Sequence, residues 1–330
     1  MTKNITLDEF ESVAKIWLDA NAREKPTSSE KESEWGEGEF SVAVFHNLTF
    51  EEESALLQEA AEWQIAKSEE GYHAITWPTQ YGGLDLPIEY ARAFARLESD
   101  YITPSRHETF SVTTRLIAPT VLHYGTDDQK NELLSDLFSA KIYCCQLFSE
   151  PGTGSDLAGL GCKAVKDGDE WVINGQKVWS SGAQFSQWGE LIARTHFDQP
   201  KHKGMTAFMI PMDLPGIEVR QIRQMSGGTS FNEVFFSDVR VPDRLRLGPE
   251  GEGWGVALTT LSFERDHSDS DGGGRAGGKW SQLLGTAKSL GLLEDPQIRQ
   301  RLMEVYTQTQ IQRFVNRRAA DLRKSGKPPG

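Results

Sequence analysis

The sequence is poor in cysteine and has no long apolar run. Its 330 residues include three cysteines, two of them adjacent at positions 144 and 145, which cannot form a disulfide framework and offer no CxxC metal spacing. We expect them to be small buried strand residues. No apolar run reaches the roughly 18 residues that span a bilayer, and the N-terminal segment resembles neither a signal peptide nor a transit peptide. A cytoplasmic protein with no membrane span is therefore expected.

Positive charge is also scarce. The formal net charge of −13 argues against nucleic acid and an anionic membrane as partners. The chain has no GK[ST], HExxH or GxSxG motif, and Gly152-x-Gly154 lacks the third glycine of a dinucleotide-binding turn and precedes predicted strands. The Asp- and Ser-rich segment that begins at His267 has Gly278 where a calcium loop needs a bidentate Glu. No metal site is expected.

The hydrophobic periodicity changes twice along the chain and divides it into three predicted domains. Residues 1–141 have helical spacing, residues 142–250 alternate as strands do, and helical spacing returns in 251–330. The expected fold class is α+β: an N-terminal helical domain, a middle domain built of an antiparallel β-sheet or barrel, and a C-terminal helical domain. Capping boxes, in which two side chains satisfy free helical N–H groups, predict three helix starts at Thr6 with Glu9, Thr49 with Glu52, and Thr126 with Gln129.

Turn residues and apolar alternation predict the strands of the middle domain. Asp167-Gly168 and Asn174-Gly175 are typical hairpin turns, because both central residues of the favoured turn need positive φ, and they flank a strand at 170–173. Further strands are predicted at 189–195, 206–211, 217–224 and 232–239. Helices are expected from about Gly253 to Arg265, at 279–290 and at 295–324.

The stretch 144–181 carries most of the chemical information. A short apolar strand breaks at Glu150-Pro151 into a loop of small residues, and the chain then returns to a Trp-Ser-Ser segment at 179–181. Glycines let backbone N–H groups approach an anion closely, so a planar cofactor with a phosphate could lie between these two edges. Ser155 has no neighbouring His signal that would make it a nucleophile, and a phosphate contact is the preferred interpretation.

Five motifs in a fixed order resemble those of acyl-CoA dehydrogenases. They are Trp77-Pro78 with Tyr81-Gly82-Gly83; Glu150-Pro151-Gly152-Thr153-Gly154-Ser155-Asp156 followed by Asn174-Gly175-x-Lys177-x-Trp179; Asp238-Val239-x-Val241-Pro242; Gly251-x-Gly253-Trp254; and Leu261-x-x-Glu264-Arg265. Residues 227–233 are most similar to bacterial members, including those that act on steroid side chains. The predicted order of helices, strands and helices agrees with this family.

The resemblance implies FAD, bound at the seam between the β domain and the helical domains, and an acyl-CoA substrate. The residues that it assigns to the cofactor are Phe148 and Ser149 along the flavin ring, Gly154 and Ser155 at the phosphate, Trp179 on one flavin face and Ser181 at N5. Gly154 and Ser155 can alternatively face the thioester end of the substrate. These residue types suit the task, because an indole covers a flat ring and small hydroxyls donate hydrogen bonds without bulk. Outside its motif, Trp179 would be interpreted as a core tryptophan.

Glu264 is the predicted catalytic base. By resemblance, the reaction is the α,β-dehydrogenation of an acyl-CoA thioester to 2-enoyl-CoA in lipid or fatty-acid β-oxidation: a carboxylate removes the α-proton and the β-hydrogen leaves as hydride to flavin N5. Such a proton requires a desolvated, well-aimed base, whose pKa an apolar pocket raises toward neutrality. Some members carry the base in this helix and others near the C-terminus, and Glu264 alone could equally be a helix ion-pair partner. Arg265 is expected to orient the base or contact the substrate.

Two departures from the family pattern concern the assembly. No Arg-x-x-Phe-Gly motif follows Arg265, although in many members its Arg reaches the FAD of a neighbouring subunit, and the last helices of the family would lie beyond Gly330. The expected protein is a homo- or hetero-oligomeric dehydrogenase that passes electrons to an electron-transfer flavoprotein. Two alternatives stay open: a non-catalytic partner subunit of a heteromeric dehydrogenase, and a flavin oxidase or monooxygenase of the same fold.

Overall fold

The computed structural model describes residues 5–25, 48–104, 107–225, 227–267 and 280–326, which fall into two compact units. The first unit ends at Glu264 and contains the N-terminal helices, the sheet and most of helix α7 (Gly253–His267). The described part of the second begins at Arg265 and contains the last two helices. The segment that was compared with a calcium loop lies mostly outside the described residues.

The N-terminal part is helical, as predicted. Its helices are α1 (Leu7–Asn21), α2 (Phe50–Glu69), α3 (Ile88–Glu98), α4 (Glu108–Ser111), α5 (Ala118–Tyr124) and α6 (Asp127–Phe138). All three predicted capping boxes are present, at Thr6, Thr49 and Thr126. A π-helical segment, Val112–Ile117, lies between α4 and α5. Two short strands, β1 (Arg23–Glu24) and β2 (Tyr101–Ile102), pair antiparallel.

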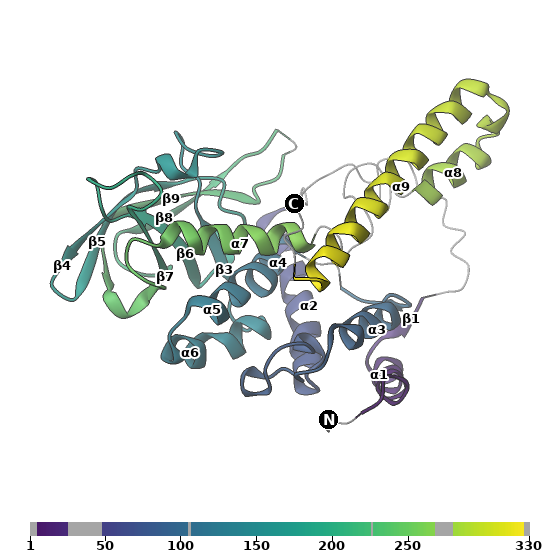
Figure 1. Cartoon of the computed structure of the whole chain (residues 1–330), viewed down its shortest axis with the longest axis horizontal. Coiled ribbons are helices and arrows are strands. Elements are labelled where there is room, and N and C mark those ends of the chain that lie inside the picture. The colour runs from purple at the N-terminus through teal and green to yellow at the C-terminus, as the bar shows by residue number, and fades with distance from the viewer. Residues whose placement is uncertain (1–4, 26–47, 105–106, 226, 268–279, 327–330) are drawn as a thin grey trace. The chain divides into compact units, whose positions relative to one another are not determined.

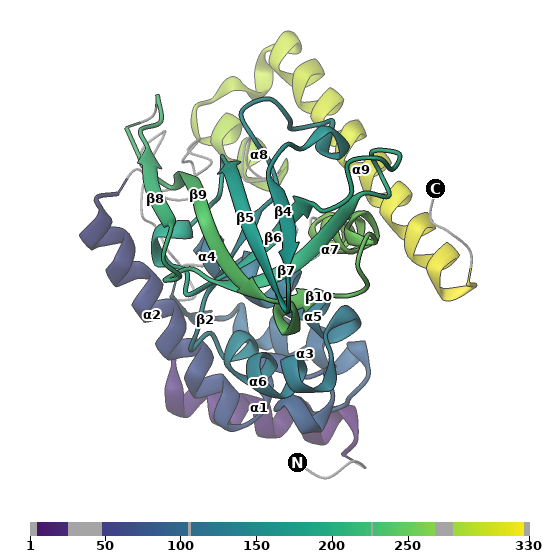
Figure 2. The ribbon, with the colours of Figure 1, turned by 90° about the vertical axis from the view of Figure 1, so that its left-hand side faces the viewer.

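The middle part is an eight-stranded sheet with the order β10-β7-β6-β4-β5-β9-β8, in which β3 also pairs with β6 (Figure 2). Its strands are β3 (Cys144–Leu147), β4 (Lys163–Asp167), β5 (Glu170–Lys177), β6 (Trp188–Arg194), β7 (Met205–Pro211), β8 (Ile217–Ile222), β9 (Phe231–Pro242) and β10 (Arg246–Leu247). Most neighbours are antiparallel, but β3 runs parallel to β6. The sheet is therefore mixed, because residues 148–187 give the chain enough length to cross over between these two strands.

The two predicted hairpin turns have different outcomes. The β4–β5 hairpin is present, but Asp167 pairs with Glu170, so the turn residues are Gly168 and Asp169, of which only Gly168 has positive φ, at 64°. The turn at Asn174-Gly175 is wrong. These residues lie inside β5 at a register shift, where Gly175 has φ 149° and a Cβ would lie 2.7 Å from Cys162 Cα. The glycine serves a close backbone approach and not a turn.

Helices cover one face of the sheet. Figure 1 shows α7 running beside β6 and β7. The apolar cluster on this face joins α5 and α6 to inward residues of β3, β6 and β7 and to Val256 of α7. A second cluster, which includes Trp171 and Phe208, lies among the strands themselves. The three cysteines are free and buried, as predicted.

The second unit contains helices α8 (Trp280–Ser289) and α9 (Pro296–Lys324). Asp295 caps α9, because its Oδ1 accepts the backbone N–H of Gln297 at 2.8 Å. Trp280 packs against Tyr306 with ring centroids 5.2 Å apart. Within the described ranges, no helix combines the length and the apolar character that a membrane span requires.

Candidate functional site

The two predicted edges of the site are joined by the backbone. Strand β3 leads directly into Phe148 and Ser149, and the C=O of Ser149 accepts the N–H of Val178 at 2.9 Å. This bond places the end of β3 beside the segment that follows β5. The structure therefore brings Phe148 and Ser149 next to the segment 179–181, although more than 25 residues separate them in the sequence.

A buried ion pair fixes the beginning of the small-residue loop. Lys177 is fully buried, and its Nζ donates to the C=O of Phe148 at 3.0 Å and to Glu150 Oε1 at 2.8 Å. The Glu150 carboxylate also accepts the N–H groups of Gly161 and Cys162, at 2.6 and 2.9 Å. Because every charged atom of this pair has hydrogen-bond partners, the pair can be buried and can hold the loop in one position. Both residues lie in motifs of the sequence, but the sequence alone indicates no role for them.

The loop itself is open toward solvent. Glu150 and Thr153 exchange two backbone hydrogen bonds, of 2.8 and 3.0 Å, which form a tight turn. Gly154 and Ser155 are exposed, and a Cβ built on Gly154 meets nothing within 4 Å. Nothing within the described chain therefore requires a glycine at 154, and its backbone is accessible to a ligand.

The side chain of Trp179 is exposed to solvent. Its side chain is 57% exposed, and its backbone has φ 62°, a conformation that costs a non-glycine residue on the order of 1 kcal/mol or more. Phe231 contacts the indole edge-on, with centroids 5.8 Å apart. The following backbone is fixed, because Ser180 N–H donates to Asn232 C=O and Asn232 Nδ2 donates back to Ser180 C=O, at 3.1 and 3.0 Å. The interpretation of Trp179 as a core tryptophan is thereby wrong.

The predicted base comes from a separate element. Glu264 is exposed on α7. Thr260, one turn earlier on the same face, is fully buried and donates from Oγ1 to Glu190 Oε1 of β6 at 2.7 Å. This contact sets how α7 packs on the sheet and therefore where the Glu264 face points. Arg265 lies on α7, but its side chain is outside the described residues.

Comparison with known proteins gives the family. Models of the N-terminal and middle domains of acyl-CoA dehydrogenases match residues 46–141 and 145–239. The acyl-CoA dehydrogenase IpdE1 of Mycolicibacterium smegmatis is 35% identical over 284 residues, which cover 83% of this chain and 72% of that protein. The chain belongs to the acyl-CoA dehydrogenase family.

Other members agree in sequence and in fold. The acyl-CoA dehydrogenase IpdE1 of Mycobacterium tuberculosis is 36% identical over 77% of this chain and 66% of its own length, and FadE34 of the same organism is 38% identical over 81% of this chain and 36% of its own length. A solved structure described as the Tcur3481-Tcur3483 steroid ACAD superposes with a TM-score of 0.70 at 25% identity, covering 99% of this chain and 79% of that chain. The predicted α+β fold with helical, β and helical parts is confirmed.

Acyl-CoA dehydrogenases carry FAD, and the residues at the two edges of this site fit such a group. Three buried polar atoms beside the exposed indole have no hydrogen-bond partner in the described chain: Ser180 Oγ, Ser230 Oγ and Asn232 Oδ1. Unsatisfied buried polar atoms are rare and indicate a missing ligand or water. An open glycine loop, an exposed indole and these polar atoms together match a planar ring with polar edges and a phosphate.

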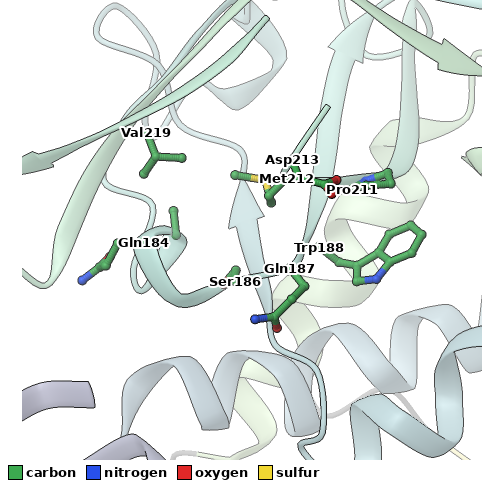
Figure 3. A pocket seen from close by; sticks show the side chains of 9 residues that line it. Gln184, Ser186, Gln187, Trp188, Pro211, Met212, Asp213 and Val219 are labelled. Carbon is green, nitrogen blue, oxygen red and sulfur yellow. The ribbon is translucent and has the colours of Figure 1, made fainter. Parts of the chain in front are cut away.

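Two features of this family member were not foreseen from the sequence. The first is a cavity of about 610 Å³ beyond Ser181, between the start of β6 and the end of β7 (Figure 3); its lining includes Gln184, Gln187, Trp188 and Met212 but none of the predicted site residues. The second is Glu190, a fully buried carboxyl in an apolar strand. Burial raises its pKa to about 8, against the weaker opposing effect of the Thr260 hydrogen bond. Its sequence signal is a lone acidic residue inside a predicted strand.

Proposed function

We propose that the chain is an FAD-dependent acyl-CoA dehydrogenase that converts an acyl-CoA thioester to the 2-enoyl-CoA. Family membership supports the reaction class. The observation that carries the proposal is the edge at 179–181, where an indole is 57% exposed in a left-handed backbone conformation beside unsatisfied buried polar atoms. A fold tolerates such a conformation where a ligand uses it.

The residues of the site have separate proposed roles in binding and in orientation. Trp179 would cover one face of the flavin, and Ser149 and Ser181 would hydrogen-bond to its polar edges. Gly154 and Ser155 receive the phosphate or the thioester end of the substrate. FAD bound at this site would supply the acceptor for the hydride that leaves the β-carbon. The Lys177–Glu150 pair contributes by keeping Phe148 and the loop in register.

Glu264 is the proposed base, which takes the α-proton on its carboxylate. Its side chain is exposed on α7, so we expect the bound acyl group to exclude water from it and thereby to favour proton transfer. Arg265, the next residue of the helix, is proposed to orient this carboxylate or to contact the substrate. The proposed electron acceptor is an electron-transfer flavoprotein, and the proposed assembly is a homo- or hetero-oligomer.

A second candidate is a partner subunit that completes the flavin site of another dehydrogenase chain. The description of the steroid ACAD names two proteins, Tcur3481 and Tcur3483, and a solved structure of Mycobacterium tuberculosis is described as the ChsE4-ChsE5 complex. The exposure of Glu264 is also compatible with a site that a second chain covers. This candidate predicts flavin and substrate turnover only when the second chain is present.

Absorbance spectroscopy separates the candidates. The purified chain is mixed with FAD, freed of excess and titrated anaerobically with a panel of acyl-CoAs. A dehydrogenase shows a flavin band that substrate bleaches, and Glu264→Gln retains the band but loses bleaching. Glu89→Gln, on the exposed surface of α3, is the matched control and should bleach as the wild type does. Unchanged bleaching in Glu264→Gln would refute this residue as the base.

A further inference from the structure

A pair of polar side chains, one fully buried and one half-buried, lies across the two parallel strands. Gln146 of β3 and Glu190 of β6 are direct partners in the register, so their side chains lie on the same face of the sheet. Helix α7 packs on that face, because Thr260 Oγ1 donates to Glu190 Oε1 at 2.7 Å. Thr120 of α5 lies 3.0 Å from Thr260, between the two hydroxyl oxygens. Two strands and two helices therefore enclose this pair.

Each partner has one polar atom that the protein leaves unused. Glu190 Oε2 and Gln146 Nε2 are both buried and have no hydrogen-bond partner in the described part of the chain. Their surroundings are apolar, since Phe148 and Ile192, the next residues along the same face, belong to the buried cluster. An unmade buried hydrogen bond costs about 1–3 kcal/mol. Two such atoms on directly opposed residues indicate that a third group binds between them.

The chemistry of the two atoms defines that group. Because burial raises the pKa of Glu190 to about 8, the carboxyl is protonated at neutral pH. Its Oε1 accepts from Thr260, which leaves the proton on Oε2 as a donor. Gln146 Nε2 is also a donor. Two convergent donors suit one oxygen atom with two lone pairs, as in a ketone or a hydroxyl group.

Glu190 is fully buried whereas Glu264 is exposed, and the Gln146–Glu190 pair lies on or against two elements of the proposed site, β3 and α7. Thr260 precedes Glu264 by four residues on α7, a rise of about 6 Å. Gln146 lies in β3 and Phe148 directly follows this strand. Because the two residues are two positions apart on extended chain, their side chains lie on the same face. An acyl group whose α-carbon reaches Glu264 would therefore point its distal carbons toward Gln146 and Glu190.

We propose that Gln146 and Glu190 bind an oxygen substituent, ketone or hydroxyl, on the part of the acyl group remote from the thioester. The pair is then a specificity device that selects oxygenated acyl groups over plain hydrocarbon ones. This proposal rests on the proposed function, because it assumes that the acyl group lies between α7 and the sheet. A ring ketone and a ketone on a straight chain present the same chemistry to the two donors.

Calorimetric titration of the protein with matched CoA thioesters tests the pair. One arm compares a medium-chain acyl-CoA with a series in which a ketone is moved along the chain, and the second compares a cycloalkyl acyl-CoA with its ring ketone. In at least one arm the wild type should bind one oxo compound about 10–100-fold more tightly than its parent, the value of one or two buried hydrogen bonds. The arm that shows the preference identifies the source of the oxygen.

Matched variants assign the preference to the two side chains. Glu190→Met and Gln146→Leu remove one donor each and should reduce the preference about 10-fold or more while binding of the parent is retained. In Glu190→Gln, the amide oxygen can still accept from Thr260 and the amide nitrogen replaces the protonated Oε2 as a donor. This variant should therefore keep the preference for the oxo compound over its parent. Gln221→Leu, on the exposed side of β8, is the control for loss of an amide.

The outcomes are distinct. Equal affinities for both members of every pair, with the parents bound, would overturn the inference and leave the proposed function standing, because the space would then hold only water. A preference that survives in both Glu190→Met and Gln146→Leu would overturn the assignment to these residues. If no acyl-CoA binds, the proposed function fails and this inference fails with it.

Discussion

Replacement of Glu190 by Gln should stabilise the protein more strongly as the pH rises. Glu190 is fully buried, and burial raises its pKa from the ordinary value of 4.5 to about 8. The folded state therefore holds this proton more tightly than the unfolded state does. The resulting stabilisation is complete below pH 4.5 and is lost as the pH rises toward about 8, at 1.36 kcal/mol per pH unit, or about 5 kcal/mol in all.

The neutral amide of Gln has the same shape and does not titrate. Its carbonyl can still accept from Thr260, so the variant should lose little packing or hydrogen bonding. The free energy of unfolding of Glu190→Gln should exceed that of the wild type by about 2 kcal/mol at pH 6 and by about 5 kcal/mol at pH 9. Titration of every other group is common to both proteins and cancels in the difference.

Urea denaturation followed by tryptophan fluorescence measures this difference. Midpoints and slopes are determined for both proteins from pH 6 to pH 9, and equal slopes show that the comparison is of stability alone. Glu89→Gln, on the exposed surface of α3, serves as the control for loss of a surface charge. A constant difference between Glu190→Gln and the wild type over this range would refute the conclusion that the carboxyl is buried and neutral.

Two further predictions concern the framework of the site. Lys177→Met should lower the free energy of unfolding by about 3–5 kcal/mol, because it leaves the Glu150 carboxylate, whose side chain is only 10% exposed, without its cation. A change under about 1 kcal/mol in chemical denaturation would contradict this. Gly182→Ala should destabilise the protein and weaken FAD binding measured by equilibrium dialysis, since Gly182 has φ 66° and a Cβ would overlap the Thr109 side chain. Gly168→Ala, also at positive φ but with nothing within 4 Å, is the matched control, and equal losses of FAD affinity in both variants would contradict the steric explanation.

Local signals in the sequence were sufficient where the cause is local. The capping boxes at Thr6, Thr49 and Thr126 are present because their hydrogen bonds join residues three apart. Gly175 was misread as a turn residue because the cause of the glycine is the backbone of Cys162, which lies in a different part of the chain. The parallel pairing of β3 with β6 likewise depends on a long crossover that alternation cannot reveal.

The site also combines features with a local sequence signal and features that depend on distant parts of the chain. The motif residues Ser149 and Trp179 were found from the sequence, and the structure places their segments side by side through the Ser149–Val178 bond. Glu190 carried only the weak signal of one acid in an apolar strand. Its importance depends on Gln146 and Thr260, which come from two other elements. The roles of all the predicted site residues remain predictions: Phe148, Ser149, Gly154, Ser155, Trp179, Ser181, Glu264 and Arg265.

The central claim is that this chain binds FAD and uses Glu264 to oxidise an acyl-CoA. Its most direct test is the visible spectrum of the FAD-treated protein before and after anaerobic addition of acyl-CoA. The wild type should show a flavin band that acyl-CoA bleaches, and Glu264→Gln should show a band that it fails to bleach. A protein that shows no flavin band after FAD is added would refute FAD binding and the proposed reaction together.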